Sequence, residues 1–395
     1  MIKPKVRTMT TAVLATALAG LLTGCGSEPA SGPRPLAETA PPVIEGYTLL
    51  VHSTYNQAHG QVASLNAALN ALVASPSEET LESARQAWLL AREPYGLTEA
   101  FRFYGGPIDD TDGPEGRINA WPMDEAYVDY VASDPNAGII NDPMTYPMID
   151  EATIASLNEK DGEKNIATGY HAIEFLLWGQ DLNADGPGQR PFTDYVVDTG
   201  TAANQQRRGQ YLQAASGLLL TDLGDVTSAW DKTDGAYAAE FLSIPPEEAL
   251  RRILLGIGSL SGAELAGERM QVAYDTKEQE DEHSCFSDNT HVDFLQNARG
   301  IRNVYLGIYG QVDGPGIDVL VRERDPALDA RMQEELEASI EAIEAIGKPF
   351  DQKILGDDTA VGRVQVKKAI DALRKQTATL VEVATLLGIS LNIEE

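Results

Sequence analysis

Apolar residues recur at helical spacing in nearly every long segment of the 395-residue chain, and this periodicity constrains its fold most strongly. It is clear in "HGQVASLNAALNALVAS" and in "ETLESARQAWLLAREPY", where Leu81, Ala84 and Trp88 share one face. No segment shows the two-residue alternation and β-branched enrichment typical of a strand. The sequence therefore predicts an all-α fold.

Two helix-bundle domains are expected within this fold, over residues 45–240 and 241–395. "ASLNAALNALVASPSEETLESARQAWLLAREPY" and the later pair "ASIEAIEAIGKPF" and "VQVKKAIDALRKQTATL" each join a short apolar helix to a longer one. This similarity is compatible with a distant internal duplication. Residues 103–165 differ, because their many Gly, Pro and Asp residues indicate loops and short turns.

The charge balance of the chain restricts its partners. Apolar residues make up 43% of the sequence, enough for substantial cores, but the formal net charge is −30. Basic residues are too few and too scattered to follow a phosphate backbone, so nucleic acid is not an expected partner. Anionic membrane surfaces are disfavoured for the same reason. The high negative charge indicates either attraction of cations to a site or simply solubility.

The N-terminus has the pattern of a secretory signal peptide. Residues 1–24 combine a basic head, a short apolar run and the small residues that precede a cleavage site. Leu22-Thr23-Gly24-Cys25 resembles a bacterial lipobox, which predicts that Cys25 is lipidated. Gly26 follows it, and by analogy with enterobacterial sorting this favours an outer-membrane lipoprotein facing the periplasm. Membrane contact is then expected through the lipid alone.

The residues that follow Cys25 have the composition of a linker. Residues 25–44 are rich in Pro, Gly, Ser and Ala, which predicts a flexible tether. If Cys25 is lipidated, Cys285 is left alone and an intramolecular disulfide is excluded.

The segment "GYHAIEFLLWGQD", residues 169–181, places two ionisable residues in an otherwise apolar helix. A helix that is apolar nearly all round is buried, so His171 and Glu174 project into an interior or a cleft. Side chains three residues apart converge, which suits two ligands of one metal ion. The alternative is a His–Glu pair in which the two side chains only hydrogen-bond to each other and bind no metal.

Two other polar blocks lie far from this helix in the sequence. In "WLLAREPYGLTEAFRF", Arg92, Glu99 and Arg102 stand among aromatic residues, and an Arg–Glu network between helices is the alternative to a ligand role. "EDEHSCFSDNTHVDF" brings His283 and Asp288 into a short polar run, for which a solvated connection with a helix cap is the alternative.

A third segment, "DLNADG" at residues 181–186, resembles the first half of a calcium-binding loop. Phe192 stands where such a loop needs a bidentate Glu, so a helix-terminating loop is predicted instead. HExxH, GxSxG and Walker signatures are absent from the sequence.

Taken together, these blocks carry a family resemblance. Gly169, His171 and Glu174 match the GxHxxE pattern of the imelysin-like family, the peptidase M75 group. "WLLAREPYGLTEAFRF" and "EDEHSCFSDNTH" resemble segments of its iron-regulated, IrpA-like branch, and the resemblance extends over residues 45–390. It implies two helix-bundle domains with the GxHxxE residues at a cleft between them, in a bacterial envelope protein associated with iron acquisition.

The resemblance also implies the site. His171 and Glu174 are expected to be metal ligands, Glu99 is a third candidate, and His283 and Asp288 are further ones. Iron is the expected metal and zinc the alternative, because carboxylates and imidazoles suit both.

Three hypotheses for the function follow. The leading one is a lipid-anchored protein that binds iron or an iron-containing small ligand. The second is a metal-dependent envelope peptidase of the M75 type, although the sequence supplies no general base beyond the expected ligands, and no catalytic residue is assigned. The third is a structural role in which His171 and Glu174 lock two helices together.

Overall fold

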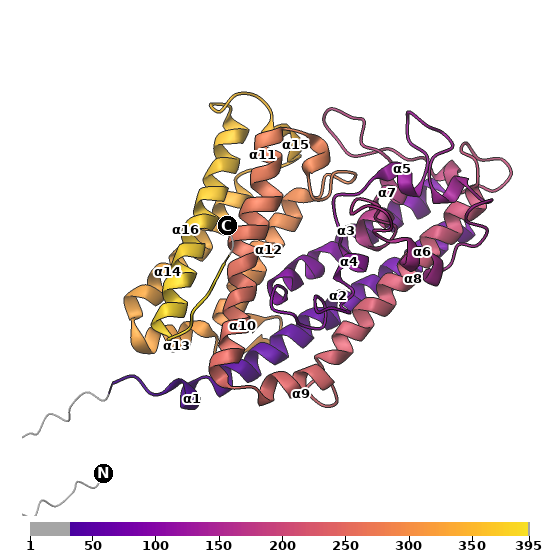
Figure 1. The fold of residues 1–395 in the computed structure, drawn as a ribbon. Helices are drawn as coiled ribbons and strands as arrows, with labels where there is room; N and C mark the ends of the chain where they lie inside the picture. Colours follow the sequence, from indigo (N-terminus) through magenta and orange to yellow (C-terminus); the bar gives the residue numbers. More distant parts are fainter. Residues whose placement is uncertain (1–31, 394–395) are drawn as a thin grey trace, which may run out of the picture. The chain divides into compact units, whose positions relative to one another are not determined.

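Helices make up nearly all the regular structure of the described part of the chain, residues 32–393 (Figure 1). The structure is a computed structural model. The predicted all-α class is confirmed, and the two short strands β1 (Ile308–Tyr309) and β2 (Val312–Asp313) pair as an antiparallel hairpin. No helix among the described residues is both long and apolar enough to span a bilayer. The predicted signal peptide and Cys25 lie outside the described residues.

The first part of the chain contributes three long helices and several short ones. They are α1 (Leu36–Thr39), α2 (Pro41–Ala74), α3 (Glu78–Thr98), η1 (Glu99–Phe101), α4 (Glu115–Ile118), α5 (Glu125–Val128), η2 (Ile139–Asn141), α6 (Glu151–Leu157), α7 (Gly169–Trp178), η3 (Phe192–Tyr195), α8 (Gln205–Ala229) and α9 (Ala236–Ser243). Only short helices occur in the described residues 103–165, in agreement with the Gly, Pro and Asp content of that region.

The remaining helices follow residue 245 and include an uncommon π-helix, η4. They are α10 (Pro246–Ser259), η4 (Leu260–Gln271), α11 (Val272–Thr276), η5 (Gln279–Asp281), α12 (Thr290–Leu306), α13 (Ile317–Arg324), α14 (Pro326–Glu344), α15 (Asp351–Ile354) and α16 (Val361–Leu386). π-Helical turns are rare and frequently occur at functional sites.

Local sequence signals explain where two of the long helices begin. Ser77 caps α3 by accepting from the Thr80 N–H, while the Thr80 hydroxyl accepts from the Ser77 N–H. Asp325 caps α14 by accepting from the backbone N–H groups of Ala327 and Leu328, and Pro326 occupies the first turn, where its missing N–H costs nothing.

Residues 36–39 and 41–44 differ from the prediction, since they are helical although a flexible tether was predicted over residues 25–44. The compact unit of the protein begins at Pro35. Val43 and Ile44 are buried on the first turn of α2, and this apolar contact explains why the chain orders before residue 45.

The helices pack in two groups joined by a close contact. Figure 1 shows α2 running beside α3 and α8, and α14 beside α12 and α16. Helices α3 and α12 pack against each other so closely that a Cβ on Gly300 would lie 2.6 Å from the Leu97 carbonyl oxygen. The larger cluster of buried apolar residues includes both Trp88 and Tyr305. The domain division near residue 240 stays a prediction.

Candidate metal centre

Helix α7 carries the GxHxxE residues and is buried along its whole length. Gly169 begins it with a φ of +81°, and a Cβ at this position would lie 2.4 Å from the Ile118 carbonyl oxygen. Both the positive φ and the close approach require glycine. The glycine of the motif therefore lets α7 start against the 114–118 segment.

Polar side chains from neighbouring elements fix α7 in place. The Tyr195 hydroxyl donates to the Leu176 carbonyl at 2.7 Å, and Arg85 donates to the Leu177 carbonyl through Nε at 3.1 Å and Nη2 at 3.0 Å. These bonds satisfy carbonyls that the end of a helix leaves unpaired. Trp88 on α3 donates from its indole nitrogen to the Tyr170 carbonyl at 3.0 Å.

His171 and Glu174 form a hydrogen-bonded pair inside the protein. Nδ1 of His171 lies 2.9 Å from Oε2 of Glu174, and the two residues are 1% and 0% exposed. The other carboxylate oxygen of Glu174 accepts from the backbone N–H of Ser287 at 3.0 Å and from its hydroxyl at 2.6 Å. Nε2 of His171 is buried and has no hydrogen-bond partner among the described residues.

His283 repeats this arrangement from the opposite side. Its Nδ1 lies 3.2 Å from Oδ2 of Asp293 and 3.4 Å from Nη2 of Arg92. We assign the proton to Nδ1 of His283, because the carboxylate is the closer group and only accepts. The rings of His171 and His283 lie edge to face, with centroids 4.8 Å apart and planes at 70°. Each imidazole is thus held at Nδ1 by a carboxylate.

Burial sets the protonation of the His171–Glu174 pair. It lowers the pKa of His171 to about 3, with Arg92 adding to the effect, and it raises the pKa of Glu174 to about 8 against the opposing Ser287 hydrogen bonds. At neutral pH both groups are therefore uncharged, and the contact is a hydrogen bond rather than an ion pair. Burial, with Arg269, also lowers the pKa of His283.

Glu99 lies in the same buried region but has other partners. Its Oε2 accepts from Arg269 at 2.6 Å and from Arg102 at 2.7 Å, and Asn119 donates to Oε1 at 3.4 Å. Burial acts to raise the pKa of Glu99, but Arg102 and Arg269 outweigh it and lower that pKa. The ligand role of Glu99 stays a prediction, and its contacts are those of an Arg–Glu network between η1 and η4.

Asp288 lies apart from the two imidazoles. Its carboxylate groups with those of Glu282 and Asp351, and the three ligand oxygens lie within 4.8 Å of one another. Burial raises the pKa of Asp288 to about 7, and the charges of Asp181 and Asp351 add to this rise. Among the described residues, this acidic group is the one set of three His, Cys, Asp or Glu side chains with that spacing. His171, Glu174, Glu99 and Asp288 are therefore not gathered around one point.

Two cavities lie near the imidazole pair, one beside His283 and the other beside Ser287. One of about 20 Å³ adjoins His283 and has room for about one water molecule. The second, of about 600 Å³, is lined by Ser287, Asp288 and His291, among others. Cys285 also lines the smaller cavity, and burial raises its thiol pKa well above the usual range.

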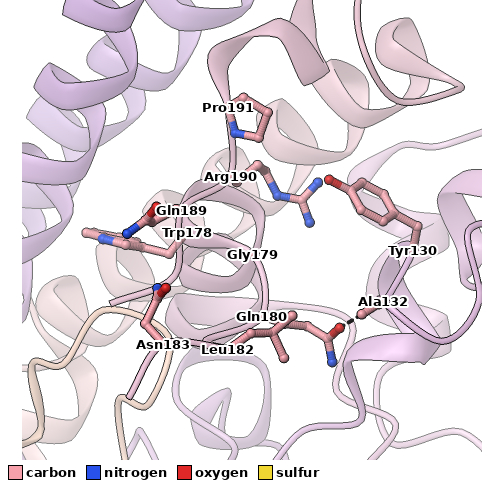
Figure 2. A pocket seen from close by; sticks show the side chains of 10 residues that line it. All are labelled: Tyr130, Ala132, Trp178, Gly179, Gln180, Leu182, Asn183, Gln189, Arg190 and Pro191. Atoms are coloured by element: carbon pink, nitrogen blue, oxygen red, sulfur yellow. Dashed lines mark hydrogen bonds between the residues drawn. The ribbon is translucent and has the colours of Figure 1, made fainter. Parts of the chain in front are cut away.

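A further cavity, of about 240 Å³, lies at the C-terminal end of α7 (Figure 2). Figure 2 shows the Arg190 side chain extending toward the Tyr130 ring, with the guanidinium carbon 4.8 Å from the ring centroid. Gln180 accepts from the Ala132 N–H at 2.7 Å. The side chains that line this cavity include no His, Cys, Asp or Glu, so it offers no usual metal ligand.

Sequence reasoning missed four residues that complete these groups, namely Glu282, Ser287, Asp293 and Asp351. The first three lie within the polar block "EDEHSCFSDNTHVDF", so the sequence pointed to their segment but not to their individual roles. Asp351 has no such signal, because it belongs to a four-residue helix far along the chain.

Fold and site together define an all-α protein with a buried centre of two histidine–carboxylate pairs. The family model for Imelysin, Peptidase_M75, matches residues 51–380, and the chain belongs to this family. It is 24% identical over 345 residues to iron-regulated protein A of Synechococcus elongatus, with 86% of each chain covered.

Solved structures agree with this assignment at the level of the fold. One is an iron-regulated protein A precursor from Parabacteroides distasonis, with a TM-score of 0.68 and 19% identity, covering 90% of this chain and 97% of the other. Another is an imelysin-like protein from Psychrobacter arcticum, with a TM-score of 0.65 and 14% identity, covering 92% of this chain and 99% of the other.

Proposed function

We propose that this chain binds an iron ion between His171 and His283 and serves iron acquisition in the bacterial envelope. The observation that carries the proposal is the Nε2 atom of His171, which is buried without a partner while Nδ1 is held by Glu174. Metal-bound histidines characteristically have a carboxylate on the second ring nitrogen, which fixes the ring and makes it a better ligand. In this proposal Glu174 orients His171 and does not itself coordinate the metal.

The spacing of the two rings supports a shared ion. With metal–nitrogen bonds of about 2.1 Å, two imidazoles at 90–110° on one metal have ring centroids roughly 4.6–5.3 Å apart. The observed separation of 4.8 Å lies within this interval. Two imidazoles leave coordination positions open, and the cavity of about 20 Å³ beside His283 has room for about one water ligand. Imidazole nitrogen also suits zinc, and the metal identity is part of the test.

Iron acquisition is supported by similarity rather than by geometry. The curated relative is named an iron-regulated protein, and the chain aligns with it over most of its length. The acidic surface implied by a net charge of −30 would concentrate cations near the protein.

The metal test compares two histidine variants of the full chain. The purified protein, loaded anaerobically with Fe(II) and in parallel with Zn(II), is analysed for bound metal by mass spectrometry. His171→Gln should lose the metal and keep its helical circular dichroism, whereas His52→Gln, a half-buried histidine of α2, should bind like the wild type. Equal metal content in wild type and His171→Gln would refute the site. A large fall in melting temperature without any metal binding would instead favour the structural hypothesis.

A metallopeptidase of the M75 type is the second candidate, and the family description favours it. A catalytic zinc needs three protein ligands and an open water position, with a base beside it. The two imidazoles are buried, and the cavity beside His283 is too small for a peptide. Incubation with a mixed peptide library, with and without a chelator, tests this candidate. Chelator-sensitive cleavage that is lost in His171→Gln would establish it.

The lipid anchor is a separate proposal, which rests on Leu22-Thr23-Gly24-Cys25. Expressed in a bacterial host with a labelled fatty acid, the wild type should incorporate label and fractionate with the outer membrane. Cys25→Ser should incorporate none, and label in this variant would exclude Cys25 as the acceptor.

A further inference from the structure

Three carboxylates that are distant in the sequence meet beside the histidine centre. Glu282 follows η5, Asp288 precedes α12, and Asp351 is the first residue of α15. Their ligand oxygens lie within 4.8 Å of one another. Acidic side chains on a protein surface often cluster without purpose, so the burial and the partners of these three decide what the cluster means.

Four oxygens of these carboxylates lack a hydrogen-bond partner among the described residues, while the second oxygen of Asp351 accepts from Gln352 at 2.6 Å. Glu282 is 0% exposed, and neither of its oxygens has a hydrogen bond of good geometry. One oxygen of Asp288 and one of Asp351 are also buried without a partner. None of the three forms an ion pair with Lys or Arg within residues 32–393. Buried polar groups in native proteins are nearly always hydrogen-bonded, and buried charges are paired or coordinate a metal.

We propose that Glu282, Asp288 and Asp351 bind a divalent cation, Ca²⁺, at a second site that is distinct from the histidine centre. Two oxygens on one Ca²⁺ ion, each at about 2.3–2.6 Å, are at most about 5 Å apart, so the observed spacing fits. All the donors are oxygen, which favours a hard cation over iron or zinc. Asp288 borders the cavity of about 600 Å³, which gives the ion and its remaining water ligands access from solvent.

The segments around the site indicate what the cation does. The loop 179–188, which follows α7, is tied to η5 by the hydrogen bond from Gln279 to Asp181 and to α15 by that from Gln352 to the Ala184 carbonyl. The proposed ligands Glu282 and Asp288 flank His283 and Ser287. Ca²⁺ would therefore link α15 to the loop of residues 282–288. This loop carries the His283 imidazole and the Ser287 hydroxyl that donates to Glu174. The partial calcium pattern of residues 181–186 borders this site without forming it.

Calcium titration of the full chain, after chelator treatment, tests the proposal. Calorimetry should give one Ca²⁺ per chain, and Ca²⁺ should raise the melting temperature. Glu282→Gln should abolish both effects, and Asp351→Asn should weaken binding by about tenfold or more, because each removes a charged ligand. Glu278→Gln, which alters an exposed carboxylate four residues away, should match the wild type. No binding by wild type at millimolar Ca²⁺, unchanged binding by both ligand variants, or a response to Mg²⁺ alone would each overturn the proposal.

His171→Gln separates this site from the proposed iron site. It should bind Ca²⁺ with unchanged stoichiometry and affinity, since its imidazole is not among the ligands. Loss of calcium binding in His171→Gln would mean that one site serves both ions, and the second site would be refuted. Failure of iron binding in the wild type, with calcium binding intact, would refute the proposed function alone. If Glu282→Gln does not fold, Asp351→Asn and Asp288→Asn carry the same comparison.

Discussion

Asp129 and Glu282 are both 0% exposed, yet their surroundings are opposite. Asp129 accepts from Arg190 Nη1 at 2.7 Å, from Arg208 Nε at 2.7 Å and Nη2 at 2.9 Å, and from Asn141 at 3.1 Å. Glu282 has no hydrogen bond of good geometry at either oxygen. Burial acts to raise the pKa of both, but the two arginines outweigh it at Asp129 and lower that pKa, whereas the pKa of Glu282 rises.

Burial of an acidic side chain therefore does not by itself indicate an ion-binding site, because a buried acid with all its hydrogen-bond partners only stabilises the fold. A missing partner does indicate one. His171 lies between the two cases, with Nδ1 satisfied by Glu174 and Nε2 unsatisfied. The region around Asp129 and Arg190 at the end of α7 should thus determine stability, and the region around His171 and Glu282 should determine ion binding.

The largest expected effect comes from breaking the contacts of Asp129. Asp129→Asn leaves the buried guanidiniums of Arg190 and Arg208 without their shared carboxylate, which should cost about 3–5 kcal/mol of unfolding free energy. Urea denaturation measures this loss, with Asp134→Asn, at an exposed position nearby, as the control. Any surviving folded protein should keep its iron and calcium affinities. A stable Asp129→Asn variant with altered metal binding would reverse the assignment of the two regions.

The next effect concerns iron rather than stability. His171→Gln removes one of two proposed imidazole ligands and should weaken Fe(II) binding by more than about 100-fold, which exceeds what loss of a supporting residue causes. Competition with a chromophoric chelator gives the affinity. The same comparison applied to His283→Gln should give a similar loss if the two rings share an ion. A loss of Fe(II) affinity in only one of the two variants would show that the ion is bound by that histidine without the other.

The sequence predicted the fold class and the key helix because both depend on local patterns. Periodicity identified the helices, and the burial of α7 followed from its apolar residues on every face. The ligand set was harder to predict, because a carboxylate three residues from a histidine gives the same sequence pattern whether it binds the metal or only orients the histidine. Asp288 shows the limit most clearly. Its carboxylate lies close to those of Glu282 and Asp351, and its proximity to Asp351 depends on how α15 packs, which no pattern in the sequence specifies.

A smaller effect should appear in the pH dependence of iron binding. With its pKa raised to about 8, Glu174 is protonated at neutral pH and donates to Nδ1 of His171, which leaves the proton on Nε2. Iron at Nε2 requires the loss of one proton from the pair. The affinity should therefore rise about tenfold per pH unit up to pH 8 and then level off.

Glu174→Gln is the variant that tests this coupling. Ser287 donates to Oε1 of residue 174, so the amide oxygen of Gln should take that place and its NH₂ should face Nδ1 of His171. That arrangement keeps the proton on Nε2 at every pH. Iron binding should fall by about 10–100-fold and the contribution of this pair to the pH slope should disappear. An unchanged pH dependence of iron affinity in Glu174→Gln would show that the proton released on iron binding comes from another group.

Cys285→Ala should have the smallest effect, although the thiol lines the cavity beside His283. Burial keeps the thiol protonated, so Cys285 should behave as a small apolar group and not as a metal ligand. Its removal leaves a small void, at a cost of about 1 kcal/mol in unfolding free energy. Iron affinity should change by less than about twofold, since the imidazoles keep their carboxylate partners. If iron affinity fell as much as in His171→Gln, the Cys285 sulfur would belong to the metal centre. The ion would then lie on the side of His283 that faces the small cavity.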